Sequence, residues 1–274
     1  MTDLSFCSVT DRRTAYRRSG RGETVLLVHG ITTNSFVWEE IVPRLSESFD
    51  VISIDLHGCG GSDLGLDADY SIAAQAESTA EFIRTLDIGP CHLVGHDIGG
   101  GIAQILAVRH RDLLRSLTLI NPVGYDFWPV QPIIAMRTPI LRQLVMATLD
   151  FGMLRLIVKR ALYHRELLDD DLMACFWDQM STGERRKAFL KLARSLNNEQ
   201  LLDIEDELRD LDLPTLILRG DADIYLSAKI CERLREDITG SRFERIDTGG
   251  HFLQLDEPDW VADHLLGFWS ESSR

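Results

Sequence analysis

An aspartate stands at the centre of a glycine-rich turn in this sequence. The segment Gly95–Gly99 (GHDIG) follows a short apolar run at 91–94 and precedes an apolar run with helical spacing at 102–110. This is the strand–turn–helix context of the nucleophile elbow, G-x-S-x-G, whose glycines allow a strand and a helix to cross closely. Asp97 occupies the position of the usual serine. A carboxylate is ionised at neutral pH, so Asp97 could attack a substrate without help from a base.

Two residues nearer the C-terminal end could complete a set of nucleophile, base and acid. His251 follows a pair of glycines, and Asp223 lies in the pattern Gly220-x-x-Asp223. The imidazole could take a proton from water, while the carboxylate held its tautomer and stabilised its charge. Asp221 competes with Asp223 for the acid role, and the spacing from Gly220 favours Asp223.

A carboxylate nucleophile is suited to an sp³ carbon rather than to an ester. Attack on an ester would give a mixed anhydride, whereas attack on an sp³ carbon with a leaving group gives a stable alkyl ester of Asp97. Water activated by His251 could hydrolyse that ester. By position, the backbone N–H groups of Ile31 and Ile98 are expected to stabilise the tetrahedral intermediate.

Alternating strands and helices must position these residues. Continuous apolar runs typical of buried parallel strands occur at 24–28, 51–55, 91–94, 117–120, 213–218 and 243–247. Helices are expected over 36–45, over 71–87 with Ser71 as N-cap, and over 260–269. This alternation predicts a parallel sheet with right-handed crossovers.

A helical block interrupts the alternation. Helical patterns cover 136–149, 152–163, 170–180 and 183–196, with no convincing strand among them. We expect residues 1–122 and 213–274 to form a core domain and residues 123–212 to form a helical cap. Because ligands bind at the carboxyl ends of parallel strands, the cap should cover Asp97.

On these motifs the chain resembles the α/β-hydrolases over nearly its full length. The motifs that carry the resemblance occur in family order: His29-Gly30, Asp55 with Gly58–Ser62, the elbow, Gly220-x-x-Asp223 and Gly250-His251. The resemblance implies an α/β-hydrolase fold, with a mostly parallel eight-stranded sheet, helices on both faces and an inserted helical cap. The branch with an aspartate nucleophile is similar to epoxide hydrolases, haloalkane dehalogenases and fluoroacetate dehalogenases.

Within that branch the resemblance favours an epoxide hydrolase, with a dehalogenase as the alternative. Haloalkane dehalogenases typically follow the aspartate with tryptophan and place an N–H donor after His-Gly, where this chain has Ile98 and Ile31. Fluoroacetate dehalogenases follow the aspartate with arginine, whereas some epoxide hydrolases carry His-Asp-Ile-Gly. Thr32 stands two residues after His29-Gly30, where these families usually have proline. A lyase or cyclase using Asp97 and His251 without a covalent intermediate is a third possibility, and the intact triad disfavours a noncatalytic receptor.

An opening epoxide needs a donor for its oxygen, and a departing halide needs N–H groups. In epoxide hydrolases a cap tyrosine usually donates, sometimes with a histidine or a second tyrosine. The cap candidates here are Tyr163, His164 and Tyr125, and Tyr163 is preferred because it ends an apolar helical run that should face inward. The tryptophans that could line the pocket or donate an indole N–H to a halide are Trp38, Trp177 and Trp128, although Trp38 could equally pack in the core and packing within the cap is favoured for Trp177.

The composition of the chain limits the classes of partner that it is expected to bind. The chain has 274 residues and a net charge of −14, which argues against nucleic acid and anionic membranes. No apolar stretch reaches the roughly 18 residues of a membrane span, and the first six residues do not resemble a secretory signal. Five scattered cysteines favour a reducing, cytoplasmic compartment. We expect a small apolar substrate, no cofactor or metal, and a monomer or homodimer.

Overall fold

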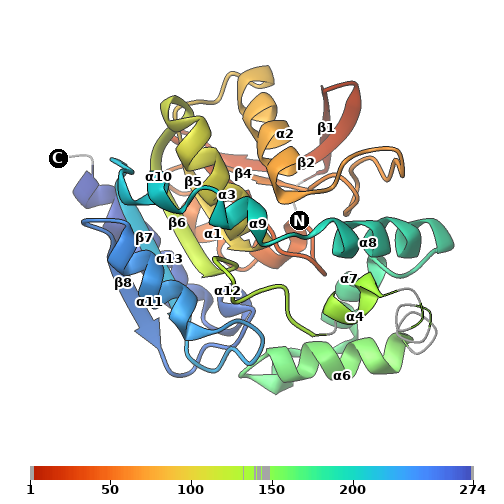
Figure 1. Ribbon diagram of the computed structural model, residues 1–274. Coiled ribbons are helices and arrows are strands. Elements are labelled where there is room, and N and C mark those ends of the chain that lie inside the picture. Colours follow the sequence, from red (N-terminus) through yellow and green to blue (C-terminus); the bar gives the residue numbers. More distant parts are fainter. Residues whose placement is uncertain (1–2, 132, 139, 141–142, 144–148, 273–274) are drawn as a thin grey trace.

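One eight-stranded sheet forms the centre of the fold (Figure 1). The computed structural model describes residues 3–131, 133–138, 140, 143 and 149–272. The strand order is β1-β2-β4-β3-β5-β6-β7-β8, in which β2 runs antiparallel to β1 and β4 and all other neighbours are parallel. The strands are β1 (Ser5–Val9), β2 (Arg12–Gly20), β3 (Thr24–Val28), β4 (Asp50–Ile54), β5 (Cys91–Asp97), β6 (Leu114–Pro122), β7 (Thr215–Gly220) and β8 (Arg242–Ile246). The predicted, mostly parallel sheet is confirmed.

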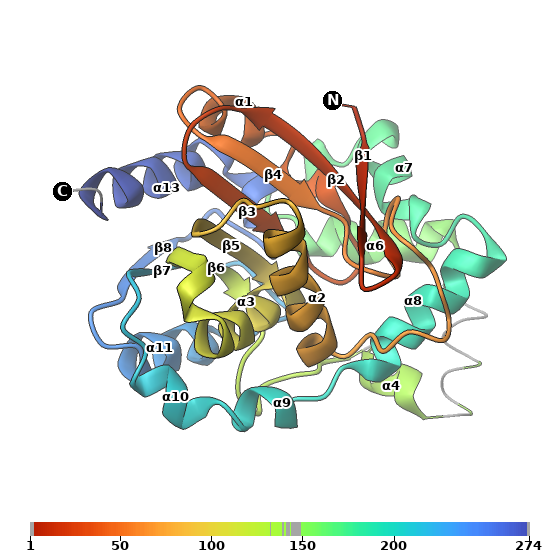
Figure 2. The same ribbon diagram turned by 90° about the horizontal axis from the view of Figure 1, so that it is seen from above.

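Helices cover both faces of the sheet (Figure 2). Side chains alternate along a strand, so Val25 and Leu27 of β3 pack into one buried cluster and Leu26 and Val28 into another. The first cluster includes residues of the short helices η1 (Ser35–Trp38), α1 (Val42–Leu45) and α12 (Leu253–Asp256) and of α13 (Pro258–Ser272). The second includes α2 (Ile72–Thr85), α3 (Ile98–Arg109) and α11 (Ala228–Asp237).

Between β6 and β7 the described residues contain helices and no strand. These helices are α4 (Ile133–Arg137), α6 (Phe151–Ala161), η3 (Arg165–Leu167), α7 (Asp170–Asp178), α8 (Gly183–Ser195), α9 (Glu199–Leu202) and α10 (Glu205–Arg209). In both views α4, α6, α7 and α8 lie together beyond one end of the sheet (Figures 1 and 2). Whether residues 123–212 behave as a separate cap subdomain stays a prediction.

Three segments differ from the sequence-based expectations. Strands β1 and β2, which no apolar run indicated, form the antiparallel edge. The single helix expected over 36–45 is two short ones, and the second, α1, begins at Val42 with Pro43 in its first turn, where proline is tolerated. The helix expected over 136–149 begins earlier, as α4, and much of its remaining range lies outside the described residues. Ser71 caps α2 as predicted, its side chain accepting from the N–H of Ala74.

Strand β3 and helix α3 approach each other so closely that only glycine fits between them. A Cβ atom added to Gly99, in the first turn of α3, would lie 2.2 Å from the carbonyl oxygen of Val28 and 2.6 Å from that of His29. Both contacts are with backbone, which has no rotamer through which it could move aside. Gly267, in helix α13, is the opposite case, because no atom beyond its chain neighbours and the adjacent backbone of its own helix lies within 4 Å of its virtual Cβ.

We therefore expect Gly99→Ala and Gly267→Ala to change stability in opposite directions. Forced displacement of β3 from α3 should cost Gly99→Ala about 3 kcal/mol or more in the free energy of unfolding. Gly267→Ala should be neutral or gain up to ~1 kcal/mol, because alanine favours a helix over glycine. Urea unfolding followed by circular dichroism measures both values. Equal stability of the two variants would contradict the close packing at Gly99.

Candidate active site

Asp97 lies on the sharp turn between β5 and α3. Its backbone has φ 54° and ψ −119°, a left-handed conformation that is rare for a residue with a side chain. The flanking glycine of the strand is required as well, because a Cβ on Gly95 would lie 2.3 Å from the carbonyl oxygen of Gly99. The turn therefore projects the Asp97 side chain from the carboxyl end of the central strand.

Backbone N–H groups meet the carboxylate of Asp97. The N–H of Ile31 donates to Oδ2 at 2.9 Å, and a Cβ on Gly30 would lie 2.7 Å from that same oxygen. Burial raises the pKa of Asp97 above its ordinary value, and His251 together with the N–H groups of Ile31 and Ile98 opposes the rise. The two N–H groups expected to stabilise an oxyanion are thus both directed at this carboxyl group.

His251 and Asp223 form the second half of the site. His251 Nδ1 lies 3.1 Å from Asp223 Oδ2, while Asp223 Oδ1 accepts from the N–H groups of Tyr225, at 2.8 Å, and Leu226, at 3.1 Å. The competing acid candidate, Asp221, instead forms a salt bridge with Arg245, whose side chain is 44% exposed. The structure thus brings His251 together with Asp223 and not with Asp221.

Neighbouring charges shift the pKa values of Asp223 and His251. Burial alone would raise the pKa of Asp223, but the charges of His251 and Arg219 and a backbone N–H outweigh it, and the pKa is lowered. Burial alone would lower the pKa of His251, but Asp223 and Asp97 outweigh it, and the pKa is raised. The free site therefore favours an ionised Asp223 beside a protonated imidazole.

Neighbouring strands hold the backbone of His251. Its carbonyl oxygen accepts from His96 Nε2 at 2.8 Å and from Asn121 Nδ2 at 3.0 Å. Burial and the proximity of His251 lower the pKa of His96 to about 3, so His96 is a neutral donor. The N–H of His251 donates to the carbonyl oxygen of Ala161, the last residue of α6, at 2.8 Å. The histidine loop is thus attached both to the sheet and to the helical block.

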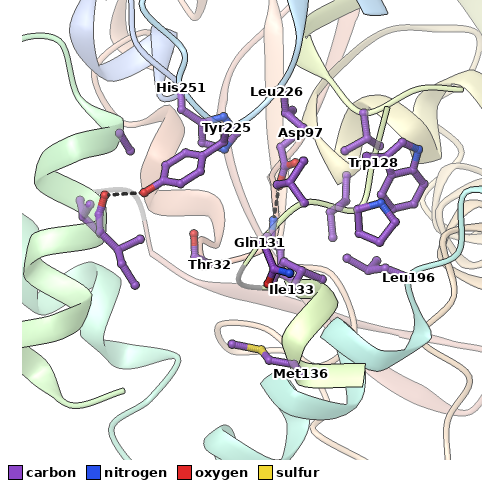
Figure 3. A pocket seen from close by; sticks show the side chains of 18 of the residues that line it. Thr32, Asp97, Trp128, Gln131, Ile133, Met136, Leu196, Tyr225, Leu226 and His251 are labelled. Carbon is purple, nitrogen blue, oxygen red and sulfur yellow. Dashed lines mark hydrogen bonds between the residues drawn. The ribbon is translucent and has the colours of Figure 1, made fainter. Parts of the chain in front are cut away.

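A mainly apolar pocket opens onto Asp97 and His251 (Figure 3). Its described lining residues are Ile31, Thr32, Asp97, Ile98, Val123, Trp128, Pro129, Val130, Gln131, Ile133, Met136, Leu149, Leu154, Ile157, Val158, Ala161, Phe189, Leu196, Tyr225, Leu226, His251 and Phe252. Apart from Asp97 and His251, polar side chains come only from Thr32, Gln131, Tyr225 and the indole of Trp128. None of these lining residues is lysine or arginine.

Tyr225 is the pocket residue that sequence reasoning missed. Its ring packs edge-on against His251, with 5.6 Å between ring centroids. Its hydroxyl donates to the carbonyl oxygen of Ile157 in α6 at 3.0 Å, a bond drawn in Figure 3. The available signal was its position two residues after Asp223, in a loop that must face the histidine.

The structure corrects the positions expected for the three cap donors, because none of them lines the pocket. The side chain of Tyr163 is 47% exposed. His164 lies near the surface, with Nε2 3.2 Å from a Glu257 oxygen. Tyr125 is buried elsewhere and donates to Asp237 at 2.9 Å. The apolar run that precedes Tyr163 does line the pocket, but α6 ends at Ala161 and the next residue is extended, which directs Tyr163 outward.

Two of the three tryptophan candidates also lie outside the pocket. Trp38 is fully buried and contacts His96 edge-on, while Trp177 packs against Phe151. Trp128 does line the pocket with its ring, but its indole nitrogen is buried without a hydrogen-bond partner. That nitrogen is covered by protein and does not face the open space.

Two features are absent from the part of the chain that the structure describes. No three His, Cys, Asp or Glu side chains gather there as ligands for a metal ion. None of its helices combines the length and apolar character needed to cross a bilayer.

Comparison with known proteins places this geometry in a family. Residues 23–258 match the model of the alpha/beta hydrolase fold. An uncharacterised protein of Mycobacterium tuberculosis is 30% identical over 97% of this chain and 80% of its own length. Epoxide hydrolase 3 of Xenopus tropicalis is 26% identical, covering 92% of this chain and 72% of its own. The crystal structure of a putative ancestral haloalkane dehalogenase superimposes with a TM-score of 0.86 at 26% identity, covering 98% and 99% of the two chains.

The two relatives that are named for a reaction are named for different ones, so similarity alone does not select a reaction for this chain. The family model, in contrast, spans more than half of the chain, and its fold agrees with the sheet order and the turn at Asp97. The chain is therefore a hydrolase of the α/β-hydrolase fold family.

Proposed function

We propose that this hydrolase opens epoxides through a covalent ester of Asp97 and releases diols. The observation that carries the proposal is the carboxylate itself. Asp97 lies at the nucleophile position, facing an apolar pocket, with one oxygen already bound by the N–H of Ile31. A carboxylate in this position can be alkylated by an epoxide, whereas ester cleavage would require a mixed anhydride.

In the first step, the carboxylate oxygen that Ile31 does not hold attacks an epoxide carbon. The C–O bond of the ring breaks as the ester bond forms, and the departing oxygen takes a proton. Tyr225 is the only phenol among the described lining residues and is the proposed donor; to donate, its hydroxyl exchanges its bond to the carbonyl oxygen of Ile157 for one to the epoxide oxygen. Burial raises the pKa of Tyr225, so the phenol is protonated at neutral pH. The resulting phenolate can regain a proton from protonated His251, whose ring it contacts.

In the second step, His251 takes a proton from water and the water oxygen attacks the ester carbonyl carbon. The N–H groups of Ile31 and Ile98 stabilise the tetrahedral oxyanion. Collapse breaks the bond to the substrate oxygen, which takes the proton from His251. In the free enzyme the charge of Asp97 helps to raise the pKa of His251. Esterification removes that charge, so His251 can release its proton when a base is needed.

The lining of the pocket favours a neutral, apolar substrate. Its walls are mostly aliphatic and aromatic side chains, and the described lining residues include no lysine or arginine that could pair with a substrate carboxylate. Transfer of apolar surface into such a pocket contributes about 25 cal/mol per Å². We therefore propose alkyl- or aryl-substituted epoxides, and not haloacids, as substrates.

A haloalkane dehalogenase remains the second candidate because it would use the same nucleophile and histidine. Its leaving group needs N–H donors, and the indole nitrogen of Trp128 is covered by protein. Apart from the ring of His251, the amide of Gln131, an exposed residue at the pocket, is the remaining side-chain N–H donor among the described lining residues. An assay of matched epoxides and bromoalkanes, with Asp97→Asn as the inactive control, tests the choice. Bromide release without diol formation would replace the first proposal with the second.

His251→Gln should trap the alkyl-enzyme. Ionised Asp97 attacks without a base, whereas hydrolysis of the ester requires one. Intact-mass spectra of His251→Gln with a substrate should show one added substrate mass, located on the peptide that contains Asp97. Asp97→Asn should show no adduct.

Turnover of the wild type in heavy-oxygen water should place label in the Asp97 carboxylate, because the water oxygen enters the ester carbonyl. A labelled product with an unlabelled Asp97 peptide would instead indicate direct attack by water, and label in neither would indicate the noncovalent lyase or cyclase class.

Tyr225→Phe should lower epoxide turnover by roughly 10²-fold, the scale of a lost general acid. Tyr163→Phe is the matched control, because Tyr163 is a half-exposed tyrosine outside the pocket, and its turnover should match that of the wild type. Steady-state kinetics and thermal melting of both variants separate catalysis from stability. If Tyr163→Phe were slow and Tyr225→Phe normal, the donor assignment would be reversed.

A further inference from the structure

A buried arginine lies directly behind the proposed acid–base pair. Arg219 belongs to β7, and its side chain is 3% exposed. Its Nη1 lies 3.3 Å from Asp223 Oδ2 and 3.4 Å from Asn121 Oδ1. Its Nη2 donates to the carbonyl oxygens of Leu226, at 2.9 Å, and Asp223, at 3.3 Å. The guanidinium is thus enclosed by protein and remains charged, because arginine does not lose its proton in proteins.

Arg219 and His251 share one carboxylate oxygen. Asp223 Oδ2 accepts from Arg219 at 3.3 Å and from His251 Nδ1 at 3.1 Å. The other oxygen is already held by two backbone N–H groups. The orientation of Asp223 therefore has support that does not depend on Arg219. What Arg219 alone adds is a permanent positive charge at the oxygen that holds the histidine.

The remaining charges around His251 explain why that positive charge matters. Asp97 and the neutral His96 face it from β5, Tyr225 contacts it from the loop after β7, and Asp256 of α12 binds the neighbouring N–H of Gly250. The residues of α6 that line the pocket are apolar. Once Asp97 is an ester, the main anion beside His251 is Asp223. A lone buried carboxylate would hold a proton on the imidazole, whereas a carboxylate balanced by arginine would not.

We propose that Arg219 is a positioning residue that balances the charge of Asp223, so that His251 is a neutral base when the Asp97 ester is hydrolysed. The role in turnover rests on the proposed function, whereas the effect on His251 does not. In agreement, Arg219 opposes the rise in the pKa of His251 in the free enzyme. Arg219 touches neither the nucleophile nor the pocket; from its place beside Asp223 its charge acts on His251 at a distance.

The first test needs no substrate. NMR titration of the His251 ring, assigned by comparison with His251→Gln, measures its protonation in the wild type, Arg219→Lys and Arg219→Met. We expect the midpoint to rise by about one pH unit in Arg219→Met and by clearly less in Arg219→Lys, which keeps the charge. An unchanged midpoint in folded Arg219→Met would overturn the proposal whether or not epoxides are substrates.

The second test separates charge balance from structural damage during turnover. In Arg219→Met, the acid limb of the pH profile of ester hydrolysis should move up by about one unit, which is tenfold slower hydrolysis on that limb. Rates should recover at high pH, and single-turnover alkylation should change less than hydrolysis. A uniform loss at every pH would indicate a structural role only and would count against the proposal.

Removal of one partner from a buried ion pair can prevent folding, so a second pair of variants keeps the test decisive. In Asp223→Asn the cation remains without its carboxylate, and in the double variant Arg219→Met/Asp223→Asn both charges are absent. The titration midpoint of His251 should be lower in Asp223→Asn than in the double variant. Equal midpoints would show that the charge of Arg219 does not reach His251.

Discussion

The backbone conformation of Asp97 constrains everything around it. A residue with a side chain at φ 54° and ψ −119° costs about 1–3 kcal/mol, which surrounding contacts must offset. They do so through close approaches of backbone to backbone, because the carbonyl oxygen of Val28 lies where a Cβ of Gly99 would sit. The parallel register that pairs Val28 with Gly95 fixes the loop after β3 relative to the elbow. The N–H of Ile31 therefore reaches the carboxylate as a consequence of sheet geometry.

Attachment of the helical block to the sheet uses the same loops that carry the proposed chemistry. Two carbonyl oxygens of α6 accept from the N–H of His251 and from the hydroxyl of Tyr225. The carboxylate of Asp256 accepts from the N–H groups of Gly250, Tyr163 and His164 at 2.9 to 3.1 Å. Because all of these bonds except that between Gly250 and Asp256 join residues 68 to 93 positions apart, the wall of the pocket and the proposed base share one support. A displacement of α6 would then alter the pocket and the histidine together.

Local patterns explain which parts of the fold the sequence predicted. Buried parallel strands are continuous apolar runs, and the tight turns need glycine, so both leave a signal within a few residues. Strand β2 has arginines at 12, 13, 17 and 18 and no such run, so the antiparallel edge was missed. In the site, the order of the motifs predicted that His251 lies with Asp223. It did not predict Tyr225, the proposed proton donor. Helical periodicity oriented α6 correctly but was extended past its end at Ala161, to Tyr163.

Long-range contacts left no comparable signal. Tyr225 meets α6 across 68 positions in the chain, and the burial of Arg219 depends on Asn121 from another strand. The cytoplasmic location and the monomer or homodimer expected from composition likewise stay predictions, because they depend on the surroundings of the chain and not on its internal contacts.

The balance of polar groups around Asp97 also bears on the leaving group. The two N–H groups at the carboxylate serve Asp97 itself, and the indole nitrogen of Trp128 is covered. Hydroxyls remain, from Thr32 and Tyr225. A halide leaves as a stable anion and needs only dipoles, whereas an alkoxide needs a proton, which a phenol can give and an amide cannot. A pocket with hydroxyl groups and little exposed N–H is therefore better matched to an oxygen leaving group. That match, with a nucleophile that needs no base, is the physical basis for proposing an epoxide.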